Sequence, residues 1–498
     1  MKKLWFVLVA SLLLVTACSK SGGEGNEGGA SGSPSASQSA DSPDNKEPVT
    51  LKIVNKDMPP DDPNTIKLVK AIEEGMAKQG TPIKLEIVPV QAGTYSEKLG
   101  LLLQGGNIPD LIYFQGGDYN FAVNQKILED LTPYIEKSTY LKASLSELNK
   151  ERMKSYPYLV WAAPIRAQVP VVRQDWFDKT ASGKALLENP TVDNYYNFFK
   201  ELKQVSGAKY VYTVAGLLPE IDVMFNQAFG LTSTWVKGAD GKYVFASTTQ
   251  AEKDKLDFYA KLYKEGLLDP EFLTKKWDTK EKAFYDGEAA IIAGTQGKII
   301  DIYNTKTVGQ NGESAKIMVL PPAKGAAQGY LPVDVSKESR GMAIASTSEN
   351  KDQAFAVLEY MASPEGQMLD KLGIQGEEYQ ITNGKIKLTD KFAAWFPHFV
   401  ENLENFKPAQ EFDPSTPYLS EPAVKSMEMF TGMSTKDNAF VMPAELAGKW
   451  DASLAVYNEF AANYVVGKVK SEDFAKFVES WNAAGGKEVA DYANTVLK

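Results

Sequence analysis

The chain has 498 residues, of which 43% are hydrophobic and 24% are charged, and its 64 acidic and 54 basic residues give a formal net charge of −10. This composition is typical of a globular protein, and the length suggests about three structural units of ~150 residues. The acidic balance argues against nucleic-acid binding, because such binding needs an excess of positive charge. The single Cys and single His exclude an intramolecular disulfide and a zinc site built from His and Cys.

The first residues predict secretion followed by lipid anchoring. Residues 1–17 read as a signal peptide, with two Lys residues before the apolar stretch Trp5–Val15. This stretch of about 11 residues is too short to span a bilayer, which takes ~20. It ends in Leu-Val-Thr-Ala-Cys, which resembles the bacterial lipobox and implies cleavage before Cys18 and acylation of that residue. Several acyl chains make a stable anchor, so we expect the protein on the extracellular face of the cell membrane. An ordinary signal peptide that contains a Cys is the alternative.

Residues 18–48 comprise this Cys and a Ser/Gly-rich linker. The linker has no aromatic or large aliphatic residue, so it cannot offset the entropy lost on ordering. A Ser/Gly chain of about 30 residues reaches roughly 30 Å, which is enough to hold a domain above the lipid surface. No later stretch is long and apolar enough to span a membrane.

Strand and helix patterns alternate over residues 49–115. Three segments have strand patterns: Val49–Val54, Ile83–Val88 and Asp110–Phe114. Two helix patterns lie between them: one that starts at Asp61–Asn64 and stops at Gly80, and Tyr95–Leu103. This order predicts a parallel sheet covered by helices, and ligands of such sheets bind beyond the carboxyl ends of the strands. We therefore expect a binding site at the loops Lys56–Asn64 and Gln115–Asn120.

The rest of the chain mixes short strands with helices and becomes mainly helical after Asp352. Val169–Phe177 is partly apolar, Phe284–Ile292 has the pattern of a helix end, a Gly turn and then a strand, and Gly341–Ala345 has the pattern of a short strand. Helices are predicted over Val192–Leu202, Lys253–Tyr263, Gln353–Met361, Glu365–Leu372, Ala444–Tyr464 and Ser471–Ala483. There is no repeat of fixed period and no Gly-rich phosphate loop between a strand and a helix.

Several segments carry recognisable motifs in a fixed order. They are Leu101–Ile112 with Pro-Asp near its end, Val172–Lys179 with Arg-x-Asp-Trp, Phe284–Ala290 with Phe-x-x-Gly-x-Ala-Ala, Ser363–Gln367 with Leu372–Tyr379, and Lys470–Gly486 with its Gly pair. Together with the lipobox and linker, they resemble the extracellular solute-binding lipoproteins of bacterial ABC importers. The resemblance is to family 1, the large carbohydrate type of Gram-positive bacteria.

This resemblance implies an α/β fold of the type II periplasmic-binding-protein kind, with two lobes, hinge crossovers and a helical C-terminal region. The expected parts are residues 49–160 with about 330–395 as lobe 1, residues 161–329 as lobe 2, and a mainly helical region 396–498 packed on the lobes. It implies a monomer without enzymatic activity that passes a carbohydrate to membrane permease subunits. No cofactor is expected. Some larger relatives hold calcium after the helix equivalent to Val192–Leu202, but Lys203–Lys209 has no carboxylate here.

Sugar recognition needs flat aromatic faces against the rings and planar polar groups for the hydroxyls. Residues of these kinds on predicted loops and crossovers are the ligand-binding candidates: Asp57, Gln115, Asp118, Tyr119, Trp161, Arg166, Trp277, Gln296, Tyr330 and Arg340. Tyr119, Trp161 and Trp277 are favoured among the aromatics because their neighbours predict loops. Core packing is the alternative for each aromatic, and helix capping is the alternative for Asp57. The sequence predicts no catalytic residue and no metal ligand.

Other residues have structural interpretations, and other functions remain open. Arg173 and Asp175 predict a structural ion pair, Trp176 a core position, and His398 a packed histidine among aromatics. A cell-surface glycan hydrolase or lyase would need only two of the 64 acidic residues to meet in a cleft. A receptor of the same fold for peptides or another small solute is also open, because fold does not fix the ligand.

Overall fold

The computed structural model describes residues 47–497 with short gaps at residues 57, 91–94, 116–118, 163–165, 217, 332–338, 400–405 and 441. The predicted signal peptide, Cys18, most of the linker and the candidates Asp57 and Asp118 lie outside the described residues. Within the described ranges, no helix has the length and apolar character needed to cross a membrane.

The first sheet has the strand order β10-β3-β1-β2. Its strands β1 (Val49–Val54), β2 (Ile83–Ile87) and β3 (Leu111–Gln115) are parallel, as the sequence predicts. The late strand β10 (Arg340–Ile344) joins β3 in the antiparallel direction, with Arg340 opposite Gln115. The carboxyl edge of this sheet therefore carries Gln115 from β3 and Arg340 from the start of β10.

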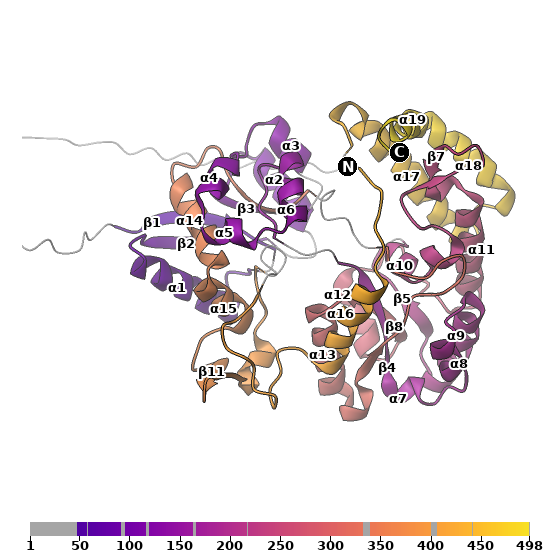
Figure 1. Cartoon of the computed structure of the whole chain (residues 1–498), viewed down its shortest axis with the longest axis horizontal. Coiled ribbons are helices and arrows are strands. Elements are labelled where there is room, and N and C mark those ends of the chain that lie inside the picture. Colours follow the sequence, from indigo (N-terminus) through magenta and orange to yellow (C-terminus); the bar gives the residue numbers. More distant parts are fainter. Residues whose placement is uncertain are drawn as a thin grey trace, which may run out of the picture. The chain divides into compact units, whose positions relative to one another are not determined.

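The helices that cover this sheet come from two parts of the sequence, one before the second sheet and one after it (Figure 1). They are α1 (Pro63–Lys78), α2 (Tyr95–Gln104), α14 (Lys351–Ala362) and α15 (Pro364–Leu372), with the short helices α3 (Tyr119–Asn124), α4 (Thr132–Lys137), α5 (Tyr140–Ser144) and α6 (Glu147–Ser155) after β3. Asp62 starts α1 by accepting a hydrogen bond from Thr65 N at 2.7 Å. Leu68, Ile72 and Met76 then bury one face of α1.

The second sheet has the order β5-β8-β4-β9. Its members are β4 (Gln168–Arg173), β5 (Tyr210–Thr213), β8 (Ala289–Thr295) and β9 (Ile317–Val319). The strands β5 and β8 are parallel and end at Thr213 and Thr295, whereas β4 runs the other way and begins with Gln168 opposite Thr295. The segment that crosses over from the first sheet therefore enters β4 at this carboxyl edge.

The helices and small strands around the second sheet are α7 (Gln174–Phe177), α8 (Ser182–Glu188), α9 (Val192–Ser206), α10 (Pro219–Phe229), β6 (Trp235–Lys237), β7 (Tyr243–Phe245), α11 (Gln250–Lys264), α12 (Trp277–Tyr285) and α13 (Lys298–Asn311). The core here is rich in aromatic rings, with Tyr195, Phe199 and Phe225 fully buried and in mutual edge-to-face contact. Each sheet thus has its own hydrophobic core, as a two-lobed fold requires.

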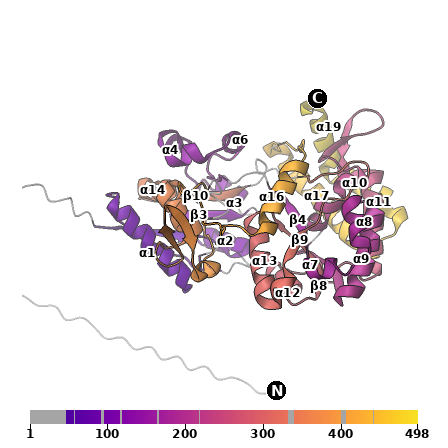
Figure 2. The ribbon, with the colours of Figure 1, turned by 60° about the horizontal axis from the view of Figure 1, so that its bottom comes forward.

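The last part of the chain differs most from the predicted elements. A hairpin of β11 (Tyr379–Thr382) and β12 (Lys385–Leu388) was not predicted. Helices α16 (Glu421–Met433) and α17 (Ala444–Val465) follow, and α16 lies along α13 (Figures 1 and 2). The predicted helix Ser471–Ala483 is shorter as α18 (Phe474–Trp481), because Ser471–Asp473 form a 3-10 turn and Asn482–Gly486 form a π turn. The backbone is left-handed at Gly485, which kinks the chain before α19 (Lys487–Val496).

Candidate functional site

The carboxyl edge of the first sheet carries a cluster of cations and aromatic rings. The guanidinium carbons of Arg152, Arg166 and Arg340 lie 5.1, 5.1 and 5.8 Å from ring centroids of Trp161. We call these four residues the arginine–tryptophan cluster. The Arg152 guanidinium also lies 5.2 Å from the Tyr156 ring. The cluster brings together three of the predicted candidates, Trp161, Arg166 and Arg340, beside Gln115.

Arg152 is the buried member of this cluster and holds it in position. Its side chain is 1% exposed. It donates to Leu159 O at 3.3 Å and to Arg340 O. One buried guanidinium therefore ties the segment before the crossover to the first residue of β10, which a planar group with several donors does better than a Lys ammonium.

The structure corrects the expectation that the favoured aromatics on this side are open loop residues. Trp161 is 1% exposed and Tyr119 is 5% exposed. The Tyr119 ring packs edge-on against Phe114 and Tyr156, and burial raises the pKa of its hydroxyl. Tyr330 is fully buried and donates to Leu320 O at 3.1 Å, so it is a core residue of the second lobe. Gly and polar neighbours predict a loop but not the direction of an aromatic side chain.

Trp277 has an exposed indole, although it starts a helix where the sequence predicted a loop, and its contact with a ligand stays a prediction. It is the first residue of α12, and 40% of its surface is accessible. The Lys280 ammonium lies 3.5 Å from a ring centroid, and the indole Nε1 donates to Glu281 Oε1 at 2.5 Å. Since α12 leads through a turn into β8, its first residue lies toward the carboxyl edge of that strand. Contacts on one face and at the ring edge hold the indole as a rigid surface for stacking.

A buried ion pair supports Trp277. Lys280 Nζ lies 2.9 Å from Glu220 Oε1, and it also donates to Ala293 O at 3.1 Å. Lys280 is fully buried, and Glu220 is 6% exposed. Burial lowers the pKa of the Lys280 ammonium and raises that of the Glu220 carboxyl, while each partner opposes the shift of the other. The Gln168 amide hydrogen-bonds the same carboxylate.

Sequence reasoning missed Lys280, Glu220 and Gln168 as members of this edge. Gln168 could have been noticed in the sequence, because it is a polar residue at the start of an otherwise apolar strand, β4. The candidate Gln296 lies at the same edge and accepts from Ala167 N at 3.0 Å. Gln296 N in turn donates to Ala167 O at 3.3 Å. Gln296 therefore fastens the crossover to the end of β8.

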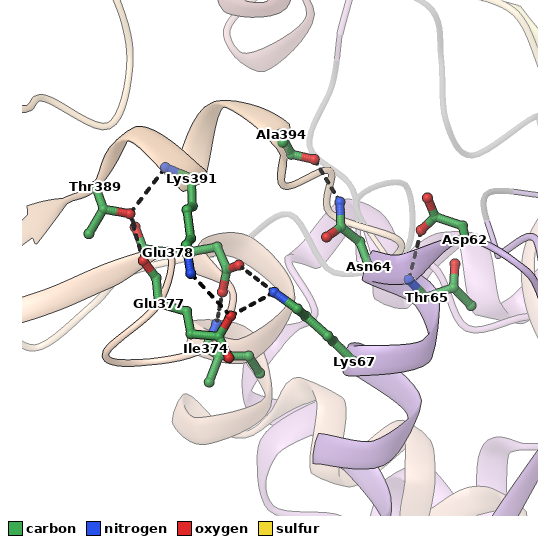
Figure 3. Close-up of polar contacts among 10 residues, drawn as sticks. All are labelled: Asp62, Asn64, Thr65, Lys67, Ile374, Glu377, Glu378, Thr389, Lys391 and Ala394. Atoms are coloured by element: carbon green, nitrogen blue, oxygen red, sulfur yellow. Dashed lines mark hydrogen bonds and ion pairs between the residues drawn. The ribbon is translucent and has the colours of Figure 1, made fainter.

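Polar contacts connect the start of α1 with the segment that contains Glu377, Glu378 and Ala394 (Figure 3). Lys67 Nζ lies 2.7 Å from Glu377 Oε2 and 3.2 Å from Glu378 Oε1, and hydrogen bonds to these carboxylates raise its pKa. Asn64 Nδ2 donates to Ala394 O at 2.7 Å. The segment that contains the β11–β12 hairpin thus fixes the first turn of α1.

His398 extends this support inside the lobe, and it is the packed histidine that the sequence predicts. It is 4% exposed, and its Nε2 lies 3.2 Å from Thr65 Oγ1. Its backbone N–H donates to Asp370 Oδ1 at 2.9 Å, and its carbonyl accepts from Asn55 Nδ2 at 3.3 Å. Burial lowers the pKa of the imidazole below its usual 6.5, against the nearby charge of Asp370.

Because the pKa of His398 is lowered in the folded protein, we expect the protein to lose stability in mild acid. The unfolded chain takes up the His398 proton near pH 6.5, whereas the folded protein takes it up only at lower pH. The contribution is therefore fully present above about pH 6.5 and is lost as the pH falls through the folded pKa, at up to about 1.4 kcal/mol per pH unit. Urea unfolding between pH 7.5 and 5.5 should show this slope, and His398→Gln should flatten it. An equal slope in the variant would contradict the assignment.

The predicted structural ion pair of Arg173 and Asp175 and the predicted core position of Trp176 are confirmed in the second lobe. Its Nε and Nη2 donate to the two oxygens of Asp175 at 3.0 and 2.7 Å, and its guanidinium carbon lies 4.1 Å from the Trp176 ring. Trp176 is 7% exposed. In the described part of the chain, no group of three or more His, Cys, Asp or Glu side chains is arranged to hold a metal ion.

Two α/β lobes with polar and aromatic side chains at the carboxyl edges of their sheets define a type II periplasmic-binding-protein fold. The chain belongs to the family of bacterial extracellular solute-binding proteins, whose model matches residues 62–368. Two curated proteins of Bacillus subtilis (strain 168) are similar along their length. Lipoprotein LipO is 22% identical, with 100% of this chain and 99% of LipO covered. The polygalacturonan/rhamnogalacturonan-binding protein YtcQ is also 22% identical, with 97% of each chain covered.

Solved structures confirm the fold. The ABC-transporter substrate-binding protein FusA of Streptococcus pneumoniae, in complex with kestose, superimposes with a TM-score of 0.63 at 15% identity. The match covers 90% of this chain and 98% of FusA. The two-lobed architecture predicted from the motifs is therefore correct, while the lobe boundaries and the ligand contacts stay predictions.

Proposed function

We propose that this protein is the substrate-binding lipoprotein of an ABC importer and captures a carbohydrate between its two lobes. Family membership supports the role of a solute receptor without chemistry of its own, and the names of YtcQ and FusA support a carbohydrate ligand. Lipid on Cys18 holds the receptor on the extracellular face of the membrane, and LipO supports this as a lipoprotein of similar length. The Ser/Gly-rich linker lets the folded part reach the permease.

The observation that carries the proposal is the exposed indole of Trp277 at the carboxyl edge of the second sheet. A pyranose ring presents an apolar C–H face that stacks on such an indole, and polar groups at the edges of both sheets then meet its hydroxyls. The ligand favours the closed arrangement of the lobes because it contacts both of them, and the permease recognises that arrangement. Hydrolysis of ATP belongs to the partner subunits.

A fluorescence experiment tests this role of Trp277. Among the described residues, it is the only tryptophan with a largely exposed side chain. Acrylamide quenching of the intrinsic fluorescence should decrease when an oligosaccharide from a panel binds, and Trp277→Ala should lower the affinity about tenfold and abolish the protection. Tyr140→Ala removes a ring that is 42% exposed on α5 and serves as the control.

Three results would contradict the proposal. One is the absence of binding to every glycan in the panel, combined with binding of a peptide. Another is the release of new reducing ends from a polysaccharide at an appreciable rate, which would favour a hydrolase. The third is protection from quenching that persists in Trp277→Ala, which would place the ligand away from this edge.

A further inference from the structure

The turn that follows β8 is covered by a helix from the C-terminal part of the chain. Gly297 N donates to Ser426 Oγ at 2.9 Å, so the middle of α16 is bonded to the residue that follows Gln296. The Ser426 side chain is fully buried. Directly before the same helix, Ser420 N donates to Asp301 Oδ1 on α13 at 2.7 Å. These two hydrogen bonds fix α16 against the turn between β8 and α13.

Met427 is the next residue of α16, and it lies on this turn without being buried. A Cβ atom at Gly297 would come within 3.2 Å of Met427 Sδ, so the thioether lies directly over the glycine backbone. Gly297 also has a φ of +80°, which favours glycine. Even so, 45% of the Met427 surface is accessible. One side of the thioether therefore packs on the turn, and the rest of the side chain is exposed.

A second exposed apolar side chain lies beside Met427. Val424, one helical turn earlier, is 42% exposed, and residues three apart share a face of a helix. The neighbouring face of α16, which carries Ala423, Ser426 and Phe430, is buried. Apolar surface residues that are scattered singly are common, whereas Val424 and Met427 form an adjacent pair beside the end of β8.

This pair lies at the candidate site. Gln296, the residue before Gly297, accepts from Ala167 N at 3.0 Å, and Ala167 belongs to the crossover between the two sheets. Met427 is therefore placed at the carboxyl edge of the second sheet, where the crossover enters β4. The exposed Trp277 starts α12 at the same edge. Both α12 and α16 contact α13, which begins at this edge (Figures 1 and 2).

We propose that Met427 contacts the bound carbohydrate, so that α16 forms part of the binding site in addition to packing on the lobes. This inference rests on the proposed function and assigns a further residue to the same site. The thioether, with Val424 beside it, packs against the apolar C–H face of a sugar ring. Methionine is flexible and polarisable, and its sulfur is only a weak hydrogen-bond acceptor. The contact therefore selects apolar ring faces rather than a particular pattern of hydroxyls.

Titration calorimetry on the purified protein tests this contact. The probes are maltotriose, cellotriose, xylotriose, mannotriose, kestose and trigalacturonate, and the variants are compared on the probe that the wild type binds most tightly. Met427→Gln should lower the affinity for that probe about 5- to 10-fold, because it places a polar amide against the ring face. Met427→Leu conserves the volume and the apolar character, so it should retain the affinity within about twofold.

A methyl resonance gives a second measurement, which needs no loss of function. In the wild type labelled with carbon-13 at the methionine methyl groups, the signal of Met427 is identified by its absence from Met427→Leu. We expect this signal to shift when the probe saturates the protein. Because the shift is observed in the wild type, it decides the question even where Met427→Gln is unstable. Thermal unfolding verifies that each variant folds.

Leu187→Gln is the matched control. It replaces an apolar side chain that is 47% exposed on α8, beyond the end of β4 and thus toward the opposite edge of the second sheet, and it should leave the affinity unchanged. Unchanged affinity in a folded Met427→Gln, or a Met427 methyl signal that does not move on saturation, would overturn the inference. Weaker binding by Trp277→Ala would then keep the proposed function, whereas binding of none of the six probes would overturn both.

Discussion

Replacement of Lys255 by Met is expected to destabilise the protein by about 3–5 kcal/mol, because one buried carboxylate, Glu252, and one partly buried carboxylate, Asp222, lose their common cation. Lys255 Nζ lies 2.7 Å from Asp222 Oδ1 and 3.0 Å from Glu252 Oε2. Glu252 is 1% exposed and accepts a further hydrogen bond from the Tyr457 hydroxyl at 2.8 Å. This network joins α10 and α11 to the C-terminal helix α17, so its loss should also loosen that helix.

The pH dependence of this loss identifies its cause. Burial already raises the pKa of Glu252, and Asp222 raises it further, while Lys255 opposes both. Without Lys255 the carboxyl takes up a proton more readily in the folded state, so the deficit should shrink as the pH is lowered. Denaturant unfolding at pH 7.5 and 5.5 measures this. Lys253→Met, which removes the partly exposed partner of the exposed Asp257 on the same helix, should cost at most about 0.5 kcal/mol. A deficit that does not change with pH would contradict the network.

Replacement of Lys280 by Met should have an effect of similar size, about 3–5 kcal/mol, since it leaves the buried carboxylate of Glu220 without its cation. The double variant Lys280→Met with Glu220→Gln should recover most of the stability, because a neutral amide is less costly to bury. Lys282→Met is the control, because Lys282 is 73% exposed on the same helix. Calorimetric unfolding of the four proteins forms the comparison.

A binding measurement shows whether the Lys280–Glu220 pair also positions Trp277 or only stabilises the fold. The Lys280 ammonium lies against the Trp277 ring, so its removal also frees the indole to change orientation. We expect the double variant to be stable but to bind the carbohydrate more weakly than the wild type. Full affinity in the double variant would contradict a positioning role for Lys280.

The first lobe was predictable from sequence because its signals are local. Val49–Val54 matches β1 residue for residue, and Asp62 caps α1 near the predicted start. The strand Gly341–Ala345 and its return to the first lobe were expected, but its antiparallel pairing with β3 was not, since β10 follows the whole second sheet in sequence. Short strands such as β11 and β12 carry too few alternating residues to distinguish them from a loop.

The sequence places several candidate residues at the ends of strands and in crossovers, but it does not show how their side chains lie. Trp277 is exposed as expected, but Trp161 is buried beneath three guanidiniums. Spacing in the sequence does not show that residues 152, 166 and 340 meet, because a crossover and a returning strand bring them together. Lys280 and Glu220 read as ordinary surface charges on helices, and only the three-dimensional fold shows that they are buried.

The return of β10 to the first sheet has a consequence for how the chain folds. Until residues 340–344 arrive, β3 is an edge strand with unpaired backbone groups, and such an edge readily pairs with other chains. Pairing across so long a sequence separation is slow, because the entropy of closing the loop must be met first. The second lobe lies within that loop, so its folding shortens the effective loop and brings both ends of the first lobe together. We therefore expect the second lobe to acquire structure first, and refolding of the first lobe to be the slow, aggregation-prone step.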